Sequence, residues 1–593
     1  MRKRITSILI CMLLTLSLTL SSCQFPFSAS KESHQTAKDE ETLPAFEAFL
    51  NEEFQNAFSD SLLTLHYTLK NPAQYGIEKP KQAFPSITEH YNDDCKAELQ
   101  KTKKNLSTIH PSSLPKEQQI LYETVKKYVD QQLTLCDYPQ FLHLLGANSG
   151  LSSNLPLTLA EYTFYSQEDV TDYLSILTQI PTLFEEAFAW EEKQADAGYS
   201  LCDFELADTI AQIDRFLDDS QTNLLIETFN QRVEALSSLS EDQLTSYKKN
   251  NEHLVNTIVI PAFQKLKNNL SRLQKNAPAG QGLSTYEDGA FYYEKLIQAK
   301  TMSDRSMNTL IKTLEKRMKD ITARIETVTK ESPKAYEIYL STESYTEDTP
   351  EEMLSYLEKA MQQDYPALSS VSYKTEPIPS ALKNNTTAAY YMVPPLDSTE
   401  ENRIYYGNAA LGSASLFMTL AHEGYPGHLY QQNYLLEQGL SPIFYVLSIT
   451  GYKEAWAFLV ANNAADYFTY GSYDREYHDA LTELYRCNDE FSYCISSLID
   501  LYVNYKGYTQ EQIATVLTSY GLDSTGDKAF YQYAVEEPGA YLQYYIGYLE
   551  LLNIRQKTEK QMGDSFNKKA FHTLLLSYGP CYFSTLEKCM LSL

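Results

Sequence analysis

Basic residues are scarce in this chain of 593 residues, where 49 lysines and arginines stand against 77 aspartates and glutamates. The formal net charge of −28 would repel a phosphate backbone, which argues against nucleic acid as a partner. The simplest role of this excess charge is solubility. Hydrophobic residues make up 43% of the chain, enough to bury a sizeable core, so the sequence is not that of a disordered protein.

The patterns of several enzyme classes are also missing. There is no Gly-x-Ser-x-Gly elbow of a serine hydrolase, no P-loop and no dinucleotide-binding glycine pattern. Seven cysteines remain after Cys11 and Cys23, and their spacings show no metal signature. We expect them to be mostly buried free thiols.

The N-terminus reads as an export signal. MRKR is followed by an apolar run over residues 5–20 that is too short, and too rich in Ser and Thr, for a membrane span. LSSC, which ends at Cys23, resembles the lipobox of bacterial lipoproteins. We therefore expect residues 1–22 to be a signal peptide and Cys23 to carry a lipid anchor at the extracytoplasmic face of the cell membrane. The alternative is an ordinary secretory signal with an incidental cysteine.

The rest of the chain is predicted to be mostly α-helical. Residues 23–42 are polar and aperiodic, as a flexible tether should be. Residues 43–593 show no strong linker and are expected to form a single large domain, with two lobes as an option. Apolar residues recur at helical spacing from Met307 to Val328. Capping boxes predict three further helix starts, at Ser240 with Gln243, Thr349 with Glu352, and Thr509 with Gln512, the last helix ending at Gly521.

Residues 370–408 break the helical pattern. The short β-prone runs AAYYMV and RIYYG are separated by turn residues, which predicts a small antiparallel sheet. An exposed edge strand there could bind the backbone of a peptide by β-augmentation. A purely structural hairpin is the equal alternative.

The stretch LAHEGYPGHLYQQ, from Leu420 to Gln432, follows directly and carries two histidines. His422 and His428 are six residues apart, which on a regular helix leaves their side chains about 120° apart. Pro426 and Gly427 lie between them, so we expect a distortion or break that lets both histidines converge on a metal. Composition alone would produce His-Glu-x4-His only about 0.01 times per chain. The competing interpretation is a helix-interior histidine followed by an ordinary helix stop.

Further segments sharpen this hypothesis. HEGYPGHLYQ followed by EAWA at residues 454–457 resembles a bacterial family catalogued as domain of unknown function 885, whose members carry HExxPGHxxQ and then EGWA. GAFYYEKL, DLYVNYKGYTQEQ and PGAYLQYYIGYLELLNIR, at residues 289–296, 500–512 and 538–555, are similar to its other elements. The resemblance implies a gluzincin-like zinc metallopeptidase with a large helical fold.

The resemblance also implies roles for individual residues. His422, His428 and Glu454 would hold one Zn²⁺, although Glu454 by itself would read as a solvated glutamate in a first helical turn. Glu423 would be the general base that takes a proton from the attacking water and passes it to the leaving amine. Tyr544 is the candidate for stabilising the oxyanion. Asp500 is expected either to support the site from behind or to be structural.

The chain departs from the family at four positions, none of them a predicted metal ligand. Ala455 replaces a glycine, Asn504 a histidine and Ser496 an arginine, while Ala461 stands where an acidic residue is common. Activity or specificity is therefore in question more than metal binding. Our leading hypothesis is a lipid-anchored zinc metallopeptidase acting on peptides. The alternatives are an inactive peptide-binding lipoprotein and a zinc hydrolase of another amide or ester.

The remaining histidines lack the spacing of metal ligands. His143, His253, His478 and His572 are interpreted as structural or exposed.

Overall fold

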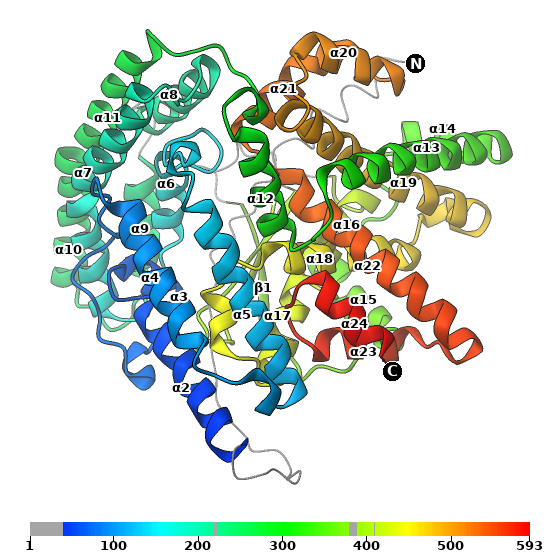
Figure 1. Ribbon diagram of the computed structural model, residues 1–593, viewed down its shortest axis with the longest axis horizontal. Helices are drawn as coiled ribbons and strands as arrows, with labels where there is room; N and C mark the ends of the chain where they lie inside the picture. Colours follow the sequence, from blue (N-terminus) through cyan, green and yellow to red (C-terminus); the bar gives the residue numbers. More distant parts are fainter. Residues whose placement is uncertain (1–38, 219–222, 379–387, 408–409, 593) are drawn as a thin grey trace.

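The computed structural model describes residues 39–218, 223–378, 388–407 and 410–592. These residues form mostly α-helices and one small sheet, which confirms the predicted fold class (Figure 1). Cys23, with the predicted signal peptide, lies outside the described residues. The first described helix begins at Asp39, so the end of the predicted tether is helical. Within the described ranges, no helix combines the length and apolar character that a membrane span needs.

The helices gather around two main hydrophobic cores. One group lies at the left of Figure 1, and its core contains Tyr173, Phe184, Phe229 and Phe263, all buried. Its helices are α3 (Leu62–Thr68), α6 (Leu151–Glu161), α7 (Gln167–Asp196), α8 (Asp203–Leu217), α9 (Leu224–Glu234), α10 (Glu241–Leu254) and α11 (Ile260–Gln274).

The second group surrounds a larger core that includes the fully buried Trp456. It comprises α2 (Asp39–Asn56), α4 (Tyr91–Leu106), α5 (Lys116–Leu135), α12 (Gly289–Thr301), α13 (Met307–Glu331), α14 (Pro333–Ser341), α15 (Pro350–Ala360), α16 (Ala414–Glu423), α17 (His428–Glu437), α18 (Thr450–Ala464), α19 (Asp474–Asn504), α20 (Gln510–Ser519), α21 (Asp527–Glu536), α22 (Ala540–Met562), α23 (Lys568–Ser577) and α24 (Phe583–Leu591).

The local helix signals in the sequence are confirmed. All three predicted capping boxes form, at the first turns of α10, α15 and α20. Gly521 follows α20 with a positive φ of 79°, a conformation that favours glycine. The apolar stripe of α13 is buried from Met307 to Ile321, while Ile325 and Val328 near its end are only partly buried.

The sheet has three strands in the order β1-β3-β2, namely β1 (Tyr373–Pro377), β2 (Ala389–Met392) and β3 (Asn402–Tyr406). β2 and β3, which contain the two predicted β-prone runs, pair antiparallel as predicted, whereas β1, which was not predicted as a strand, pairs parallel with β3. The reason is topological. The chain reverses direction twice between β1 and β3, and β3 then lies between the other two strands.

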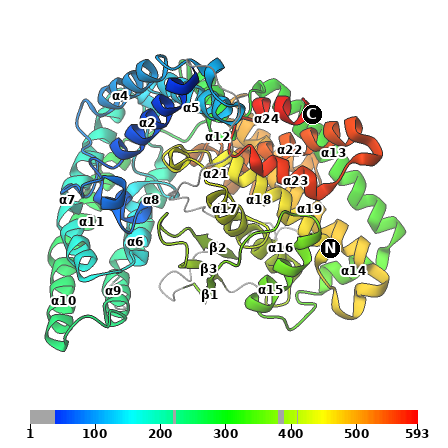
Figure 2. The same ribbon diagram turned by 90° about the horizontal axis from the view of Figure 1, so that it is seen from below.

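The sheet also bridges the two groups of helices, as Figure 2 shows. Ile378 and Tyr405 form a small buried cluster, against which Leu157 of α6 and Leu224 of α9 pack. Tyr390 on β2 adds a hydrogen bond from its hydroxyl to the carboxylate of Glu161, at the end of α6. Since Ile404 on β3 belongs to the larger core, both groups of helices hold the sheet in place.

Close packing of α18 against α22 positions the remaining site residues. A Cβ added at Gly547 on α22 would lie 2.6 Å from Cβ of Ala455 and 2.7 Å from the carbonyl oxygen of Gly451. Since both contacts are shorter than a side chain can tolerate, only glycine permits this approach. This close approach at Gly547 brings the second turn of α22 beside the start of α18.

Candidate metal centre

The helix of the LAHEGYPGHLYQQ stretch breaks, as the sequence predicted. α16 ends at Glu423 and α17 begins at His428. A Cβ added at Gly427 would lie 1.8 Å from the carbonyl oxygen of His422, so the turn can close this tightly only around glycine. Trp456 Nε1 on α18 donates a hydrogen bond of 2.9 Å to the carbonyl oxygen of Pro426. The turn is therefore held directly against the helix that carries Glu454.

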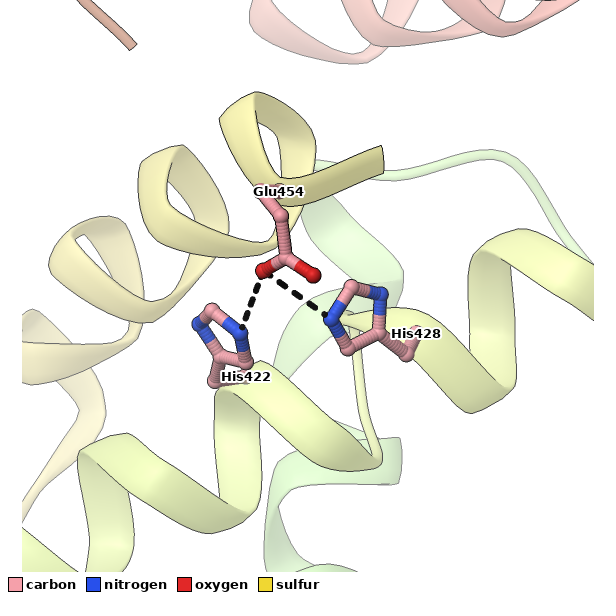
Figure 3. A group of neighbouring side chains, drawn as sticks. All are labelled: His422, His428 and Glu454. Carbon is pink, nitrogen blue, oxygen red and sulfur yellow. Dashed lines mark ion pairs between the residues drawn. The ribbon is translucent and has the colours of Figure 1, made fainter. Parts of the chain in front are cut away.

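The three predicted ligands converge (Figure 3). Nε2 of His422 lies 3.3 Å, and Nε2 of His428 3.5 Å, from Oε2 of Glu454. One potential ligand atom from each residue falls within 4.8 Å of the others, an arrangement that could hold a metal ion. The two imidazole rings are nearly perpendicular, with centroids 4.8 Å apart. The break in the helix thus brings the side chains of His422 and His428, six residues apart, to the same carboxylate oxygen of Glu454.

The chemistry of the three side chains fits a divalent cation. Glu454 is 1% exposed, and neither of its carboxylate oxygens accepts a hydrogen bond of normal geometry from the described residues. Burial favours the neutral carboxyl, but the charges of His428 and His422 outweigh it and lower the pKa of Glu454 to about 2. A buried carboxylate needs a compensating partner, and two histidines with one glutamate form a ligand set that suits zinc.

Glu423 follows the first histidine and faces the sheet. Its Oε2 accepts a hydrogen bond of 3.0 Å from the backbone N–H of Tyr391 on β2. Burial raises the pKa of Glu423 above its ordinary value, despite the opposing charges of His422 and His428. A carboxylate with a raised pKa is better matched to accepting a proton near neutral pH.

The same hydrogen bond shows which edge of β2 faces the site. Ala388 directs its carbonyl oxygen toward β3, where it accepts from the N–H of Gly407 at 2.9 Å. Because backbone groups alternate along a strand, those of Ala389 and Tyr391 point to the opposite, outer edge. That edge is the one beside Glu423.

Tyr544 lies next to the predicted metal ligands. Its ring centroid is 6.5 Å from that of His422. Tyr545 donates a hydrogen bond of 3.3 Å to Glu490 instead. Tyr541 and Tyr544 both pack on Tyr493, but the ring contact with His422 is made by Tyr544. The structure therefore places Tyr544, the tyrosine predicted from the sequence, beside His422.

Asp500, on α19, is buried beside the N-terminus of α22 and away from the predicted metal ligands. It accepts hydrogen bonds from the hydroxyl of Tyr293 at 2.7 Å and from the backbone N–H of Gly539 at 2.6 Å. A third comes from Nδ2 of Asn504 at 2.9 Å. Burial raises the pKa of Asp500 to about 6. These contacts fix the N-terminus of α22, the helix that carries Tyr544. Asp500 therefore supports the site indirectly.

The residues that depart from the family pattern have structural partners. Asn504 also donates to the carbonyl oxygen of Ala534 at 2.6 Å and accepts from the N–H of Leu283 at 3.1 Å. The Ser496 hydroxyl donates to the carbonyl oxygen of Ser492, one turn earlier in α19. Ala461 is buried. These side chains pack into the body of the protein without entering the centre.

The sequence analysis missed Asp489 on α19. Its Oδ2 accepts a hydrogen bond of 3.2 Å from Nδ2 of Asn462, two turns beyond Glu454 on α18. Burial raises the pKa of Asp489 to about 7, and its charge lies close enough to His422 to raise the pKa of that imidazole in turn. No motif marks Asp489, because only the packing of α19 against α18 brings it near.

The other histidines stay away from the centre, as expected. His143 pairs with Glu191 at 2.7 Å, His572 is buried against the carbonyl oxygen of Asp364, and His253 is exposed. His478 contacts the carbonyl oxygen of Phe468. The seven described cysteines are unpaired, and five of them are buried, as the sequence predicted.

Comparison with known proteins identifies the family of this chain. Residues 72–590 match the family described as "Bacterial protein of unknown function (DUF885)". The chain belongs to this family. Among curated proteins, none matches it. The DUF885 match spans His422, His428, Glu454 and Tyr544 together.

Two solved structures share the fold. A "putative lipoprotein" from Colwellia psychrerythraea is 17% identical with a TM-score of 0.81, and the match covers 92% of this chain and 98% of the other. A "putative lipoprotein of unknown function" from Shewanella oneidensis is 15% identical with a TM-score of 0.62, covering 93% and 99%. At identities this low, the likeness shows only that this chain and the two solved structures share a fold.

Proposed function

We propose that this DUF885 protein is a zinc-dependent peptidase. The observation that carries the proposal is the convergence of His422, His428 and the buried, otherwise unsatisfied carboxylate of Glu454. A structural zinc site would use four protein ligands, whereas three leave a position open for water and substrate. A zinc ion bound there would supply a Lewis acid and lower the pKa of water at its open position.

Glu423 is the proposed general base. Its position next to His422 in sequence, and its hydrogen bond from Tyr391, hold the carboxylate at the edge of the metal cluster. The carboxylate would accept a proton from the attacking water and deliver it to the amine that leaves. The pKa of Glu423, raised by burial, favours this exchange.

The outer edge of β2 is the proposed platform for the substrate backbone. Ala389 and Tyr391 point backbone groups to that edge, and the N–H of Tyr391 already reaches Glu423. A peptide bound in extended form along this edge would lie beside the general base. The ring of Tyr544 lies 6.5 Å from that of His422, and its hydroxyl would donate to the oxyanion.

We place this activity outside the cytoplasm. LSSC at Cys23 resembles a lipobox, and both structural neighbours are described as putative lipoproteins. A lipid on Cys23 would hold the peptidase at the membrane surface.

The decisive test is cleavage of a mixed peptide library by the full chain, purified in detergent and loaded with zinc, with products identified by mass spectrometry. Glu423→Gln should retain zinc and lose cleavage, because it removes the proton acceptor without touching a ligand. Glu347→Gln, at an exposed glutamate far from the motif in sequence, is the matched control and should cut like the unmodified chain. If the unmodified chain holds zinc but cuts no peptide, the peptidase proposal is wrong, and a peptide-binding role or another amide or ester substrate takes its place.

A further inference from the structure

A cavity of about 220 Å³ lies where the two groups of helices meet. Its walls come from residues 140–150, the start of α8, the loop before α12 together with α12, and the end of α21. Figure 1 shows α8 within the left-hand group, with α12 and α21 on the other side. None of the three metal ligands lines it. A cavity of about 150 Å³ already accommodates a benzene-sized ligand, so this one can take an amino-acid side chain.

One wall of the cavity is acidic. Glu205, Glu536 and Glu537 line it. The basic groups beside them are already engaged, since Lys300 Nζ donates to the carbonyl oxygen of Pro538 at 2.8 Å and His143 pairs with the buried Glu191. Three carboxyl groups therefore line the cavity against one ammonium group, that of Lys300, so an incoming cation would meet more acidic than basic groups.

Among the carboxylates of the cavity, Glu536 is the one whose hydrogen bonding is incomplete when it is ionised. Its Oε2 accepts a hydrogen bond of 2.9 Å from Nδ2 of Asn148, whereas the buried Oε1 has no donor among the described residues unless Glu536 or Asp208 is protonated and the two carboxyls share that proton. Burial, together with the carboxylates of Asp208 and Glu205, raises the pKa of Glu536 to about 8. A buried acceptor without a donor is costly, and a donor carrying positive charge would relieve both the missing bond and the repulsion.

A second wall is aromatic. Phe141 stacks on Tyr292 with ring centroids 4.7 Å apart and meets Tyr199 edge to face at 5.5 Å. Tyr199 in turn lies 5.5 Å from Tyr286, and all four rings line the cavity. Aromatic faces attract ammonium and guanidinium groups through their quadrupoles, whereas they provide no ligand for a metal ion.

The acidic wall and the aromatic wall together indicate which class of ligand the cavity can bind. Among the described residues, only His422, His428 and Glu454 group closely enough to hold a metal, so the carboxylates of this cavity are not a metal cluster. We propose that the cavity binds an organic cation, namely the guanidinium or ammonium side chain of an arginine or lysine residue in a peptide, with Glu536 as its principal partner. The identification of that peptide as a substrate rests on the peptidase function proposed above.

The cavity is connected to the metal centre through the chain itself. Glu536 and Glu537 precede Gly539, whose N–H is held by Asp500, and α22 begins at the next residue. Tyr544, in the second turn of that helix, lies beside His422. A basic residue seated in the cavity would thus contact the segment that leads into the helix carrying Tyr544.

Direct binding tests the cavity independently of catalysis. The full chain, purified in detergent and stripped of metal with a chelator, is titrated calorimetrically with N-acetyl-arginine amide and with N-acetyl-citrulline amide, its neutral isostere. A charge-assisted hydrogen bond typically favours the charged ligand by about 10- to 100-fold. Glu536→Gln should reduce this discrimination to about threefold or less, while Glu287→Gln, an exposed residue beside Tyr286 that does not line the cavity, should preserve it.

Equal affinity for the two ligands, or binding of neither by the folded chain, would overturn the proposal. If Glu536→Gln proves unfolded by thermal melting, the discrimination shown by the unmodified chain decides alone, with Tyr286→Leu as the second variant expected to weaken it. In the zinc-loaded chain, cleavage near arginine and lysine should be favoured, and Glu536→Gln should lose that preference. Discrimination without any cleavage would support the cavity and reject the peptidase function.

Discussion

Replacing Gly427 by alanine should disrupt the metal centre without changing any ligand. The added Cβ would lie 1.8 Å from the carbonyl oxygen of His422 and 2.4 Å from that of Ala421. Both obstacles are backbone atoms of α16, so no side-chain rotation can relieve the contact. The variant must therefore open the turn between the two histidines.

The size of the opening follows from the geometry. Cβ atoms do not approach other heavy atoms closer than 3.0 Å, so Gly427→Ala requires the Cβ and the His422 oxygen to separate by at least 1.2 Å. Metal ligands must keep their distances to within about 0.2 Å. We expect zinc affinity to fall by at least about 10- to 100-fold, the loss typical of misplaced ligands. The overpacked turn should also lower the free energy of unfolding by about 1–3 kcal/mol.

Zinc affinity would be measured by competition with a chromophoric chelator, and stability by thermal melting of the metal-free chain. Gly526→Ala is the matched control, because its Cβ would meet only the ring of Phe530 at an ordinary 3.7 Å, and its φ of −86° suits any residue. Gly427→Ala with unchanged zinc affinity would refute the argument that this turn sets the distance between His422 and His428.

Three further predictions follow from the site and the core. Glu454→Gln should weaken zinc binding by more than about 100-fold in equilibrium dialysis, since it removes a charged ligand. Tyr544→Phe should lower kcat for a cleaved peptide by about 100- to 1000-fold with zinc content unchanged, whereas Tyr541→Phe should leave kcat near its original value. Burial lowers the pKa of His572 to about 4, so the unfolded chain binds its proton more readily, and the stability contribution present above pH 6.5 is lost as the pH falls toward 4. Between pH 7 and 5 the share of His572 in the loss of stability is about 2 kcal/mol, so His572→Gln should lose about that much less than the unmodified chain over this step in urea unfolding.

Features that depend on residues within about one helical turn were predictable from the sequence. The capping boxes at Ser240, Thr349 and Thr509 depend on residues three apart, and all three form. The break between Glu423 and His428 follows from the local effects of Pro426 and Gly427. Such signals depend on neighbouring residues alone, so the rest of the fold does not alter them.

Features that join distant segments were predicted poorly or not at all. The parallel pairing of β1 with β3 depends on which strand takes the middle of the sheet, and the sequence of each strand does not say. The approach of Asp489 to His422 and the contact of Tyr391 with Glu423 connect separate elements. The cavity around Glu536 draws on segments almost 400 residues apart.

By itself, the sequence determined the helical character of this protein, the position of the break between His422 and His428, and the identity of the residues converging there. Helical period, caps and the Pro-Gly break are local, and the spacing of His422, His428 and Glu454 lies within 33 residues of one chain segment. The tertiary structure alone decided what surrounds them: the edge of β2 against Glu423, Tyr544 rather than its neighbours beside His422, and an acidic and aromatic cavity between the two groups of helices. The physical reason is that burial, charge compensation and close packing are properties of atoms brought together from many elements, which no local pattern records.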